Sequence, residues 1–295
     1  MSGTFSDEPA SPAGLWRFWP LRFALFFVVT IGAYAGCQIL PLVIAQHIAF
    51  VPPAVTAVVF AMLAVSILVT IYRLLVQWTE RRAVTELSAK SAMPLFGDGV
   101  LIGVVLFSAV VAVIGLSGSA TINGIVGYDG LIKAATASLV AAIGEEIAFR
   151  GGVYRLLEEG FGSLIAIAIS GAMFGLLHMA NPGATTASTL AIALEAGILL
   201  AAAYVLTRSL WLPIGLHFGW NFTEGGIFGA AVSGGKSHGL IATTFAGPEW
   251  LTGGAFGPEA SLPAVALCVI TAAVLLILAI RRGEWKPMRF RLTTA

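Results

Sequence analysis

The chain has 295 residues, of which 58% are hydrophobic and only 11% carry a charge. A soluble domain usually contains roughly 25% charged residues, so this composition excludes an ordinary soluble protein and predicts an integral membrane protein in a lipid bilayer. The formal net charge is +1, and no excess of either charge indicates nucleic acid as a partner.

The composition changes once along the chain, close to the N-terminus. Residues 1–16 are rich in Ser, Pro and acidic residues, a composition that buries little apolar surface and predicts a disordered cytoplasmic tail. The remainder, 17–295, shows no internal repeat, and we expect it to form a single membrane domain.

Long apolar runs follow this tail. A run of about 20 apolar residues can cross a hydrocarbon core of about 30 Å as a helix. The sequence has eight such runs and therefore predicts an all-α fold, a polytopic membrane helix bundle with about eight transmembrane helices. They cover about 22–46, 54–72, 99–117, 131–150, 162–180, 187–206, 211–231 and 262–280. Between the second and third runs, residues 80–98 mix charged and apolar positions, which fits an interfacial amphipathic helix or a solvated loop.

The basic residues are unevenly distributed between the segments that connect these runs. With both termini in the cytoplasm, most of the 16 Lys and Arg residues fall in cytoplasmic segments, whereas Lys133 and Lys236 lie toward the outside. Cytoplasmic loops carry an excess of Lys and Arg, so the distribution predicts that both termini are cytoplasmic.

Three ionisable residues, Glu145, Glu146 and Arg150, lie at the end of the fourth run. A charged side chain at mid-bilayer costs roughly 2.5–3.5 kcal/mol on insertion scales, so these residues need a reason to be there. Glu146 and Arg150 share a helix face and are predicted to form an ion pair. Glu145 points about 100° away around the helix and lacks such a partner on its own helix. The structural alternative is a salt bridge plus a glutamate that extends to the membrane boundary.

The fifth run contains Phe174 one helical turn before His178, so that the phenyl ring can shield the imidazole from lipid. In the same run, Gly171 and Gly175 form a small-residue pair that allows a neighbouring backbone to approach closely. A single histidine near a helix end is more often structural than catalytic.

The seventh run places His217 and Asn221 four residues apart on one helix face. Hydrogen bonding between helices would explain this pair without any catalytic role. However, a carboxylate, two imidazoles and an amide that converge from three helices would form a hydrolytic site with a base, proton carriers and an oxyanion donor.

The three motifs also carry a family resemblance. They resemble, in order, the signature of the type II CAAX prenyl endopeptidases and of their bacterial relatives, the CPBP (Abi) family of intramembrane proteases. The matching motifs are Glu145-Glu146-x-x-x-Arg150, Phe174-x-x-x-His178 and His217-x-x-x-Asn221. The resemblance covers about residues 130–230, which we expect to be the protease core.

The resemblance implies an intramembrane endopeptidase of a bacterial plasma membrane. Such an enzyme hydrolyses peptide bonds of peptides or membrane-protein substrates near the cytoplasmic membrane face. Its implied roles are water activation by Glu145 together with His178, oxyanion stabilisation by His217 and Asn221, orientation of the base by Glu146 and Arg150, and support from Phe174.

Two alternatives accompany this hypothesis. The family is often described as metalloproteases, and a zinc ion would be bound by Glu145, His178 and His217; the chain lacks a His-Glu-x-x-His motif, and a metal-free mechanism with glutamate and histidine is preferred. A non-catalytic membrane protein, such as an immunity factor, a partner-binding scaffold or a transporter, is the alternative function. Glu195 and Glu224 also lie in apolar runs, where structural or interfacial roles are favoured over a place in the cavity.

Overall fold

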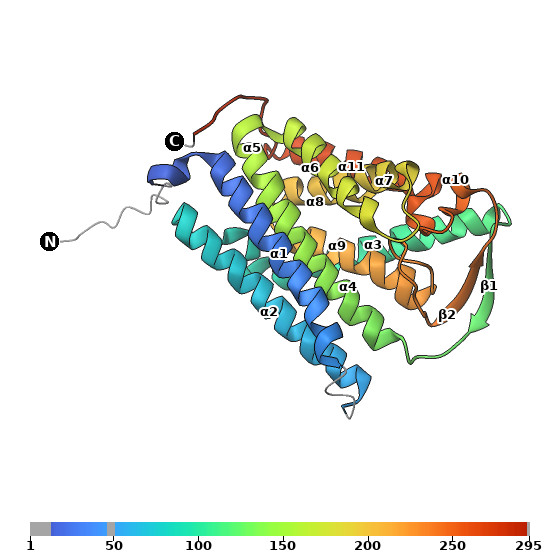
Figure 1. Ribbon diagram of the computed structural model, residues 1–295. Helices are drawn as coiled ribbons and strands as arrows, with labels where there is room; N and C mark the ends of the chain where they lie inside the picture. Colours follow the sequence, from blue (N-terminus) through green and yellow to red (C-terminus); the bar gives the residue numbers. More distant parts are fainter. Residues whose placement is uncertain (1–12, 46–50, 294–295) are drawn as a thin grey trace.

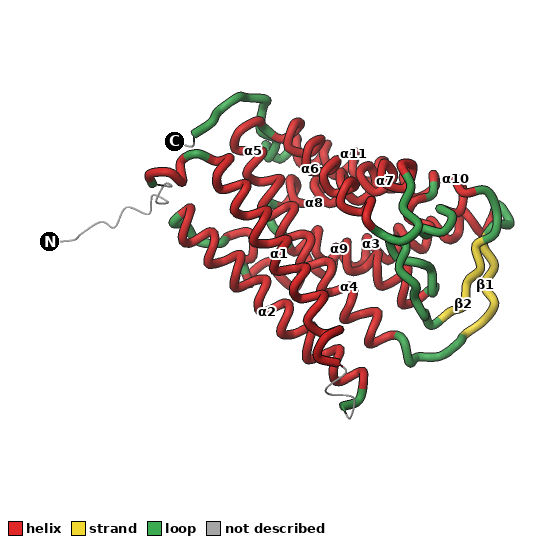
Figure 2. Tube along the Cα trace, in the orientation of Figure 1, coloured by secondary structure: helices red, strands yellow, loops and turns green. Residues whose placement is uncertain are grey.

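Helices dominate the structure, because a chain in lipid must satisfy its backbone hydrogen bonds internally. The computed structural model describes residues 13–45 and 51–293, and within these it consists of packed helices with one two-stranded ribbon (Figures 1 and 2). The all-α prediction is confirmed. Most of the predicted tail, 1–12, lies outside the described residues, and its last part belongs to a 3-10 helix, η1 (Gly14–Arg17).

The first part of the chain forms long helices that precede a short strand. These elements are α1 (Trp19–Ala45), α2 (Pro53–Glu80), the 3-10 turns η2 (Thr85–Leu87) and η3 (Ala89–Ser91), α3 (Ala92–Leu116) and β1 (Ala120–Ile125).

The second part contains three helices in which a π-helical segment interrupts or extends the α-helix. Its elements are α4 (Leu131–Glu146), π-helix η4 (Ile147–Tyr154), α5 (Arg155–Phe161), α6 (Ser163–Leu177), η5 (His178–Ala180), α7 (Thr186–Ile192), π-helix η6 (Ala193–Gly197), α8 (Ile198–Thr207), α9 (Trp211–Asn221), π-helix η7 (Phe222–Ile227), β2 (Ile241–Phe245), α10 (Glu249–Thr252), η8 (Pro258–Ala260) and α11 (Leu262–Arg281).

Each of the eight predicted spans coincides with a helical segment. In the described part of the chain, six of these segments are long and apolar enough to cross a membrane on length and composition alone. The other two are the charged helix over 131–161, which runs on through η4 and α5, and the shorter helix over 211–227. Large apolar side chains such as Met62 and Leu101 point outward and are 67% and 63% exposed, as expected for a surface in contact with lipid.

The amphipathic helix considered for residues 80–98 does not form. Two short turns, η2 and η3, lead directly into α3. The carboxylates of this stretch are buried rather than solvated, because Arg82 pairs with Glu80 at 2.7 Å and with Glu86 at 2.8 Å, while Arg155 from α5 also pairs with Glu80. These ion pairs hold Glu80 and Glu86 inside the bundle, whereas Arg81, Lys90 and Asp98 of the same stretch remain exposed.

Glycines set the distance between α3 and α9. A Cβ atom at Gly99 or Gly103 of α3 would overlap the α9 backbone, and one at Gly215 or Gly219 of α9 would overlap the α3 backbone. Each helix therefore presents a small-xxx-small pair to the other, which allows the two backbones to touch. The predicted close approach at Gly175 is confirmed in the same way, since a Cβ there would overlap the backbone of α7.

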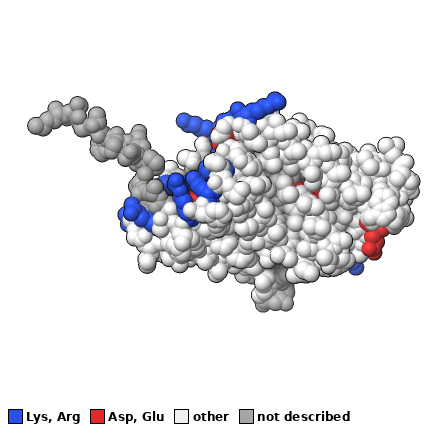
Figure 3. Space-filling model, turned by 90° about the horizontal axis from the view of Figure 1, so that it is seen from above, with Lys and Arg blue, Asp and Glu red and all other residues white. Residues whose placement is uncertain are grey.

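The two ends of the bundle differ in what they carry. At one end the C-terminal segment crosses the start of α6, where the Ser163 amide donates to the Lys286 carbonyl at 3.0 Å. The antiparallel β1–β2 ribbon, with Ala120 opposite Phe245, lies at the other end (Figure 1). Lys and Arg side chains gather at the first end, where the described chain begins (Figure 3).

Candidate functional site

The predicted pair of Glu146 and Arg150 is formed. Glu146 has no solvent exposure, and Arg150 Nη1 donates to its Oε1 at 3.0 Å. Arg150 Nη2 donates to the backbone carbonyls of Ala196 at 2.9 Å and Gly197 at 3.0 Å. The guanidinium therefore links the fourth membrane helix to π-helix η6 and satisfies carbonyl groups of that wide turn.

His217 of α9 lies between the two glutamates of α4. Its Nδ1 donates to Glu146 Oε1 at 3.0 Å, and its Nε2 lies 3.9 Å from Glu145 Oε2. Because Nδ1 is bonded to Glu146, Nε2 is the ring nitrogen that faces the carboxyl of Glu145. Glu146 and its partner Arg150 thus orient His217, whereas the sequence had led us to expect that they orient Glu145.

Glu145 has a partner that the sequence did not reveal. Tyr34 on α1 donates its hydroxyl to Glu145 Oε1 at 2.9 Å. The tyrosine ring packs directly over Gly144, where any Cβ atom would overlap it. Tyr34 lies 111 residues before Glu145, so no helical spacing in the sequence could have connected them.

Phe174 is the packing centre of the site. Its ring centroid lies 4.7 Å from that of His178 and 6.4 Å from that of His217, and the Arg150 guanidinium lies 4.8 Å above the ring. The predicted contact between Phe174 and His178 is present. His178 Nδ1 also donates to the Phe174 carbonyl at 2.8 Å, so Nε2 is the ring nitrogen left for other partners.

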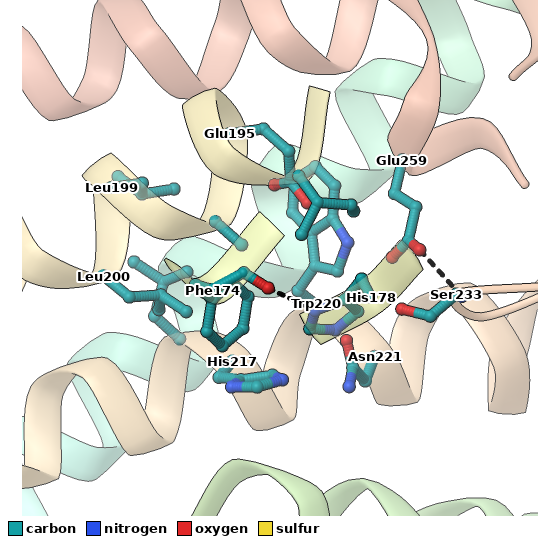
Figure 4. Close-up of a pocket in the computed structure, with 13 residues that line it drawn as sticks. Phe174, His178, Glu195, Leu199, Leu200, His217, Trp220, Asn221, Ser233 and Glu259 are labelled. Carbon is teal, nitrogen blue, oxygen red and sulfur yellow. Dashed lines mark hydrogen bonds between the residues drawn. The ribbon is translucent and has the colours of Figure 1, made fainter. Parts of the chain in front are cut away.

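One pocket contains most of the predicted site. His178, His217 and Asn221 line one small pocket with a volume of about 20 Å³ (Figure 4). Glu145 and Glu146 lie outside its lining, and Glu145 reaches it through His217. No direct hydrogen bond joins Glu145 to His178 within the described residues, and their joint activation of a water stays a prediction.

Further polar residues of the pocket were not chosen from the sequence. Glu195, Trp220, Ser233 and Glu259 also line it. For Glu195 a structural role was favoured, yet its carboxyl lies in the pocket wall, and its position within an apolar run was the available signal. Ser233 comes from a loop and Glu259 from the three-residue 3-10 turn η8, and neither segment has a periodicity that could place them.

Three helices supply the α4 motif, the pocket residue Glu195 and the α9 motif. Each of these helices contains a π-helical segment at or next to those residues. Arg150 lies in η4, Glu195 lies in η6, and Asn221 directly precedes η7. π-Helical turns are rare and often occur at functional sites. These wide turns change which side chains face the bundle interior, and they do so at the positions of the polar residues of the site.

The pocket lies in the half of the bundle away from the termini. His178 follows the far end of α6, whose first residue, Ser163, contacts the C-terminal segment. Ser233 belongs to the loop that precedes β2 and Glu259 to η8, which follows α10, and β2 and α10 lie at the ribbon end (Figure 2). Cytoplasmic termini and a site near the cytoplasmic face were both expected from the sequence, and the described residues place the pocket nearer the ribbon end than the end with the termini.

The residues proposed as zinc ligands, Glu145, His178 and His217, do not form a ligand set. Within 13–45 and 51–293, no three His, Cys, Asp or Glu residues lie close enough together to bind one metal ion. Both imidazoles use Nδ1 in hydrogen bonds within the protein, which leaves only Nε2 of each for a metal, so the distances between the side chains decide against a shared ion. The arrangement therefore does not fit a zinc ion bound by these three side chains.

Comparison with known proteins connects this site to one family. No curated protein and no solved structure matches the chain. Residues 128–223, about a third of the chain, match the family described as Type II CAAX prenyl endopeptidase Rce1-like. The matched segment includes all three motifs. The resemblance seen in the motifs is thus confirmed: residues 128–223 of this membrane protein are similar to the type II CAAX prenyl endopeptidases.

Proposed function

We propose that this protein is an intramembrane endopeptidase that hydrolyses peptide bonds with Glu145, His178, His217 and Asn221. The observation that supports this most directly is the position of His217. Its imidazole is fixed by Glu146, faces Glu145 and lines the same pocket as His178 and Asn221. A carboxylate, two imidazoles and an amide thereby become parts of one constellation built from three helices.

In the proposed reaction, Glu145 acts as the general base. It takes a proton from a water molecule beside His217 Nε2, and the water oxygen bonds to the carbonyl carbon of the peptide. The amide of Asn221 donates to the resulting oxyanion, a contact worth about 10²–10³ in rate at comparable sites. The proton then passes to the amide nitrogen, the C–N bond breaks, and the two peptide products leave. No step requires a metal ion.

The charge distribution supports an orientation for this reaction. Because Lys and Arg gather at the end that carries the termini (Figure 3), we place that end in the cytoplasm of a bacterial plasma membrane. The pocket then lies in the opposite half of the bilayer. Cleavage near the non-cytoplasmic face replaces the cytoplasmic-face cleavage that the resemblance implied.

The Glu145→Gln substitution tests the proposal, since glutamine keeps the shape of the side chain but cannot act as a base. Membranes that contain either the wild type or this variant are incubated with a peptide library, and the released peptides are identified by mass spectrometry. We expect cleavages that occur only with the wild type. The control, Glu249→Gln, changes an exposed carboxylate on α10 and should cleave as the wild type does. Equal peptide release by the wild type and Glu145→Gln would exclude the proposed role.

A further inference from the structure

The proposed general base, Glu145, is held by a residue of another helix. Its side chain is mostly buried, with 16% of its surface exposed. In the described part of the chain, one hydroxyl donates to its carboxyl, that of Tyr34 on α1, at 2.9 Å from Oε1. The second oxygen, Oε2, lies 3.9 Å from His217 Nε2, which is too long for a direct hydrogen bond. The two oxygens of Glu145 therefore have different surroundings.

Tyr34 itself is fixed by its packing. Its ring lies over Gly144, so closely that a Cβ atom there would overlap the ring. The ring also packs against a small cluster formed by Ala61 and Ala64 of α2 and Val140 of α4. Because the ring is enclosed by two neighbouring helices, its hydroxyl has little freedom to move relative to α4.

Gln38, one helical turn after Tyr34, fixes the direction of the hydrogen bond. Its side-chain amide donates to the Tyr34 hydroxyl oxygen at 3.4 Å. A phenol has a single proton, and its oxygen accepts from other donors, so that proton is directed to Glu145 Oε1. Oε2 is then the oxygen left for a water molecule. A water in the gap of 3.9 Å between Oε2 and His217 Nε2 would contact both atoms.

We infer that Tyr34 is a positioning residue for the general base, an inference that rests on the proposed peptidase function. By holding Oε1, the Tyr34 hydroxyl aims Glu145 Oε2 at the water that attacks the peptide carbonyl. Oε2 takes a proton from that water as the new O–C bond forms, and this proton moves to the amide nitrogen as the C–N bond breaks. The Tyr34 proton stays on the phenol oxygen throughout. Tyr34 lies outside the segment 128–223 that matches the family, so it adds a fourth helix, α1, to the site.

The Tyr34→Phe substitution tests this role, because it keeps the ring that packs on Gly144 and removes only the hydroxyl. We expect kcat to fall by about 10- to 100-fold, as for hydrogen bonds to charged groups. KM and the thermal unfolding temperature should stay unchanged, since Tyr34 does not line the pocket and the ring packing is kept. The control, Tyr128→Phe, alters a tyrosine that is 70% exposed and should keep the wild-type kcat. An unchanged kcat in Tyr34→Phe, or a raised KM at constant kcat, would overturn the positioning role.

A second background shows whether Tyr34 acts through Glu145. Glu145→Asp keeps a carboxylate but is one methylene shorter, so it no longer reaches the Tyr34 hydroxyl. Adding Tyr34→Phe to Glu145→Asp should leave the residual kcat unchanged, because the effects of residues in one hydrogen-bonded unit are not additive. A hydroxyl with a merely structural role would lower kcat by the same factor in both backgrounds, and that result would contradict the inference.

A chemical readout measures the contact without any cleavage. N,N′-Dicyclohexylcarbodiimide, an apolar reagent that modifies carboxyl groups, is added to membranes, and the labelling of Glu145 is quantified by mass spectrometry. Label should accumulate faster in Tyr34→Phe than in the wild type or in Tyr128→Phe, because the Tyr34 hydroxyl no longer occupies Oε1. Equal labelling of all three proteins would show that Tyr34 does not hold this carboxyl.

The same variants separate a failure of this inference from a failure of the proposed function. If Glu145→Gln is inactive while Tyr34→Phe is fully active, the peptidase function stands and the positioning role is wrong. If the wild type and Glu145→Gln release the same peptides, the proposed function fails and the positioning role fails with it, while faster labelling in Tyr34→Phe would still establish the contact.

Discussion

At the scale of single residues, Glu146 accepts hydrogen bonds from two side chains at once. One oxygen accepts from both Arg150 and His217, at 3.0 Å in each case. The Glu146 carboxylate therefore connects the Arg150 guanidinium to the His217 imidazole, and the positive charge of Arg150 compensates its negative charge. This double role explains why a charged pair persists in the interior of a membrane helix, where either partner alone would be unfavourable.

The Arg150→Ala substitution should destabilise the fold by about 3–5 kcal/mol, because it leaves the fully buried Glu146 carboxylate without its cation. Denaturant unfolding of the purified protein in detergent measures the loss. Arg282→Ala removes an exposed arginine that follows α11 and serves as the control, with a change below about 0.5 kcal/mol. Similar unfolding midpoints for the two variants would show that Arg150 does not compensate the buried charge.

Glu158 should give the fold a dependence on acidic pH. This residue lies on α5, at the end of the bundle that carries the termini. Burial disfavours its ionised form, but Arg208 at 2.6 Å and Lys286 at 2.8 Å outweigh burial and lower the pKa of Glu158 from 4.5 to about 2. A depressed folded-state pKa contributes stability above the unfolded value, so this contribution is complete above pH 4.5 and is lost as the pH falls toward 2.

The shift corresponds to roughly 3 kcal/mol at neutral pH. Unfolding free energy measured from pH 7 to pH 2 should therefore fall below pH 4.5 in the wild type. In Glu158→Gln the unfolding free energy should be lower at pH 7 and change less with pH, while Glu249→Gln should follow the wild-type curve. A Glu158→Gln curve parallel to that of the wild type would contradict the assigned ion pairs.

At the scale of elements, the contact of α3 with α9 determines where His217 and Asn221 lie. Gly103→Ala and Gly219→Ala would each place a methyl group inside the backbone of the opposite helix. We expect each variant to separate the helices, to lose at least tenfold in peptidase activity and to unfold at a lower temperature. Gly36→Ala on α1, where a Cβ meets nothing within 4 Å, should retain both properties. Full activity in Gly219→Ala would show that the site tolerates a displaced α9.

The sequence predicted what lies within one helix better than what lies between helices. The spans followed from apolar length, and the pairs Glu146–Arg150 and Phe174–His178 followed from a spacing of four residues. The contacts of Tyr34 with Glu145 and of His217 with Glu146 join residues 111 and 71 positions apart, and no local pattern encodes them. Glu259 of the short turn η8 could not be placed for the same reason.

At the scale of the whole molecule, the two ends of the bundle should be accessible from opposite sides of the membrane. Single cysteines replace the exposed residues Lys236, at the ribbon end, and Met288, at the end with the termini, in a background without Cys37 and Cys268. A membrane-impermeant maleimide should label Lys236→Cys in intact cells and Met288→Cys only after permeabilisation. The reverse pattern would place the pocket toward the cytoplasm and restore cleavage near that face.

The π-helical segments have a consequence for comparing this protein with others. A π-turn holds one residue more than an α-turn, so each of η4, η6 and η7 shifts the rest of its helix by about 100° relative to a helix that is α throughout. An alignment with a relative whose membrane helices are regular therefore needs a one-residue gap inside 147–154, 193–197 and 222–227. Without those gaps, the alignment would pair residues that occupy different positions in the two structures.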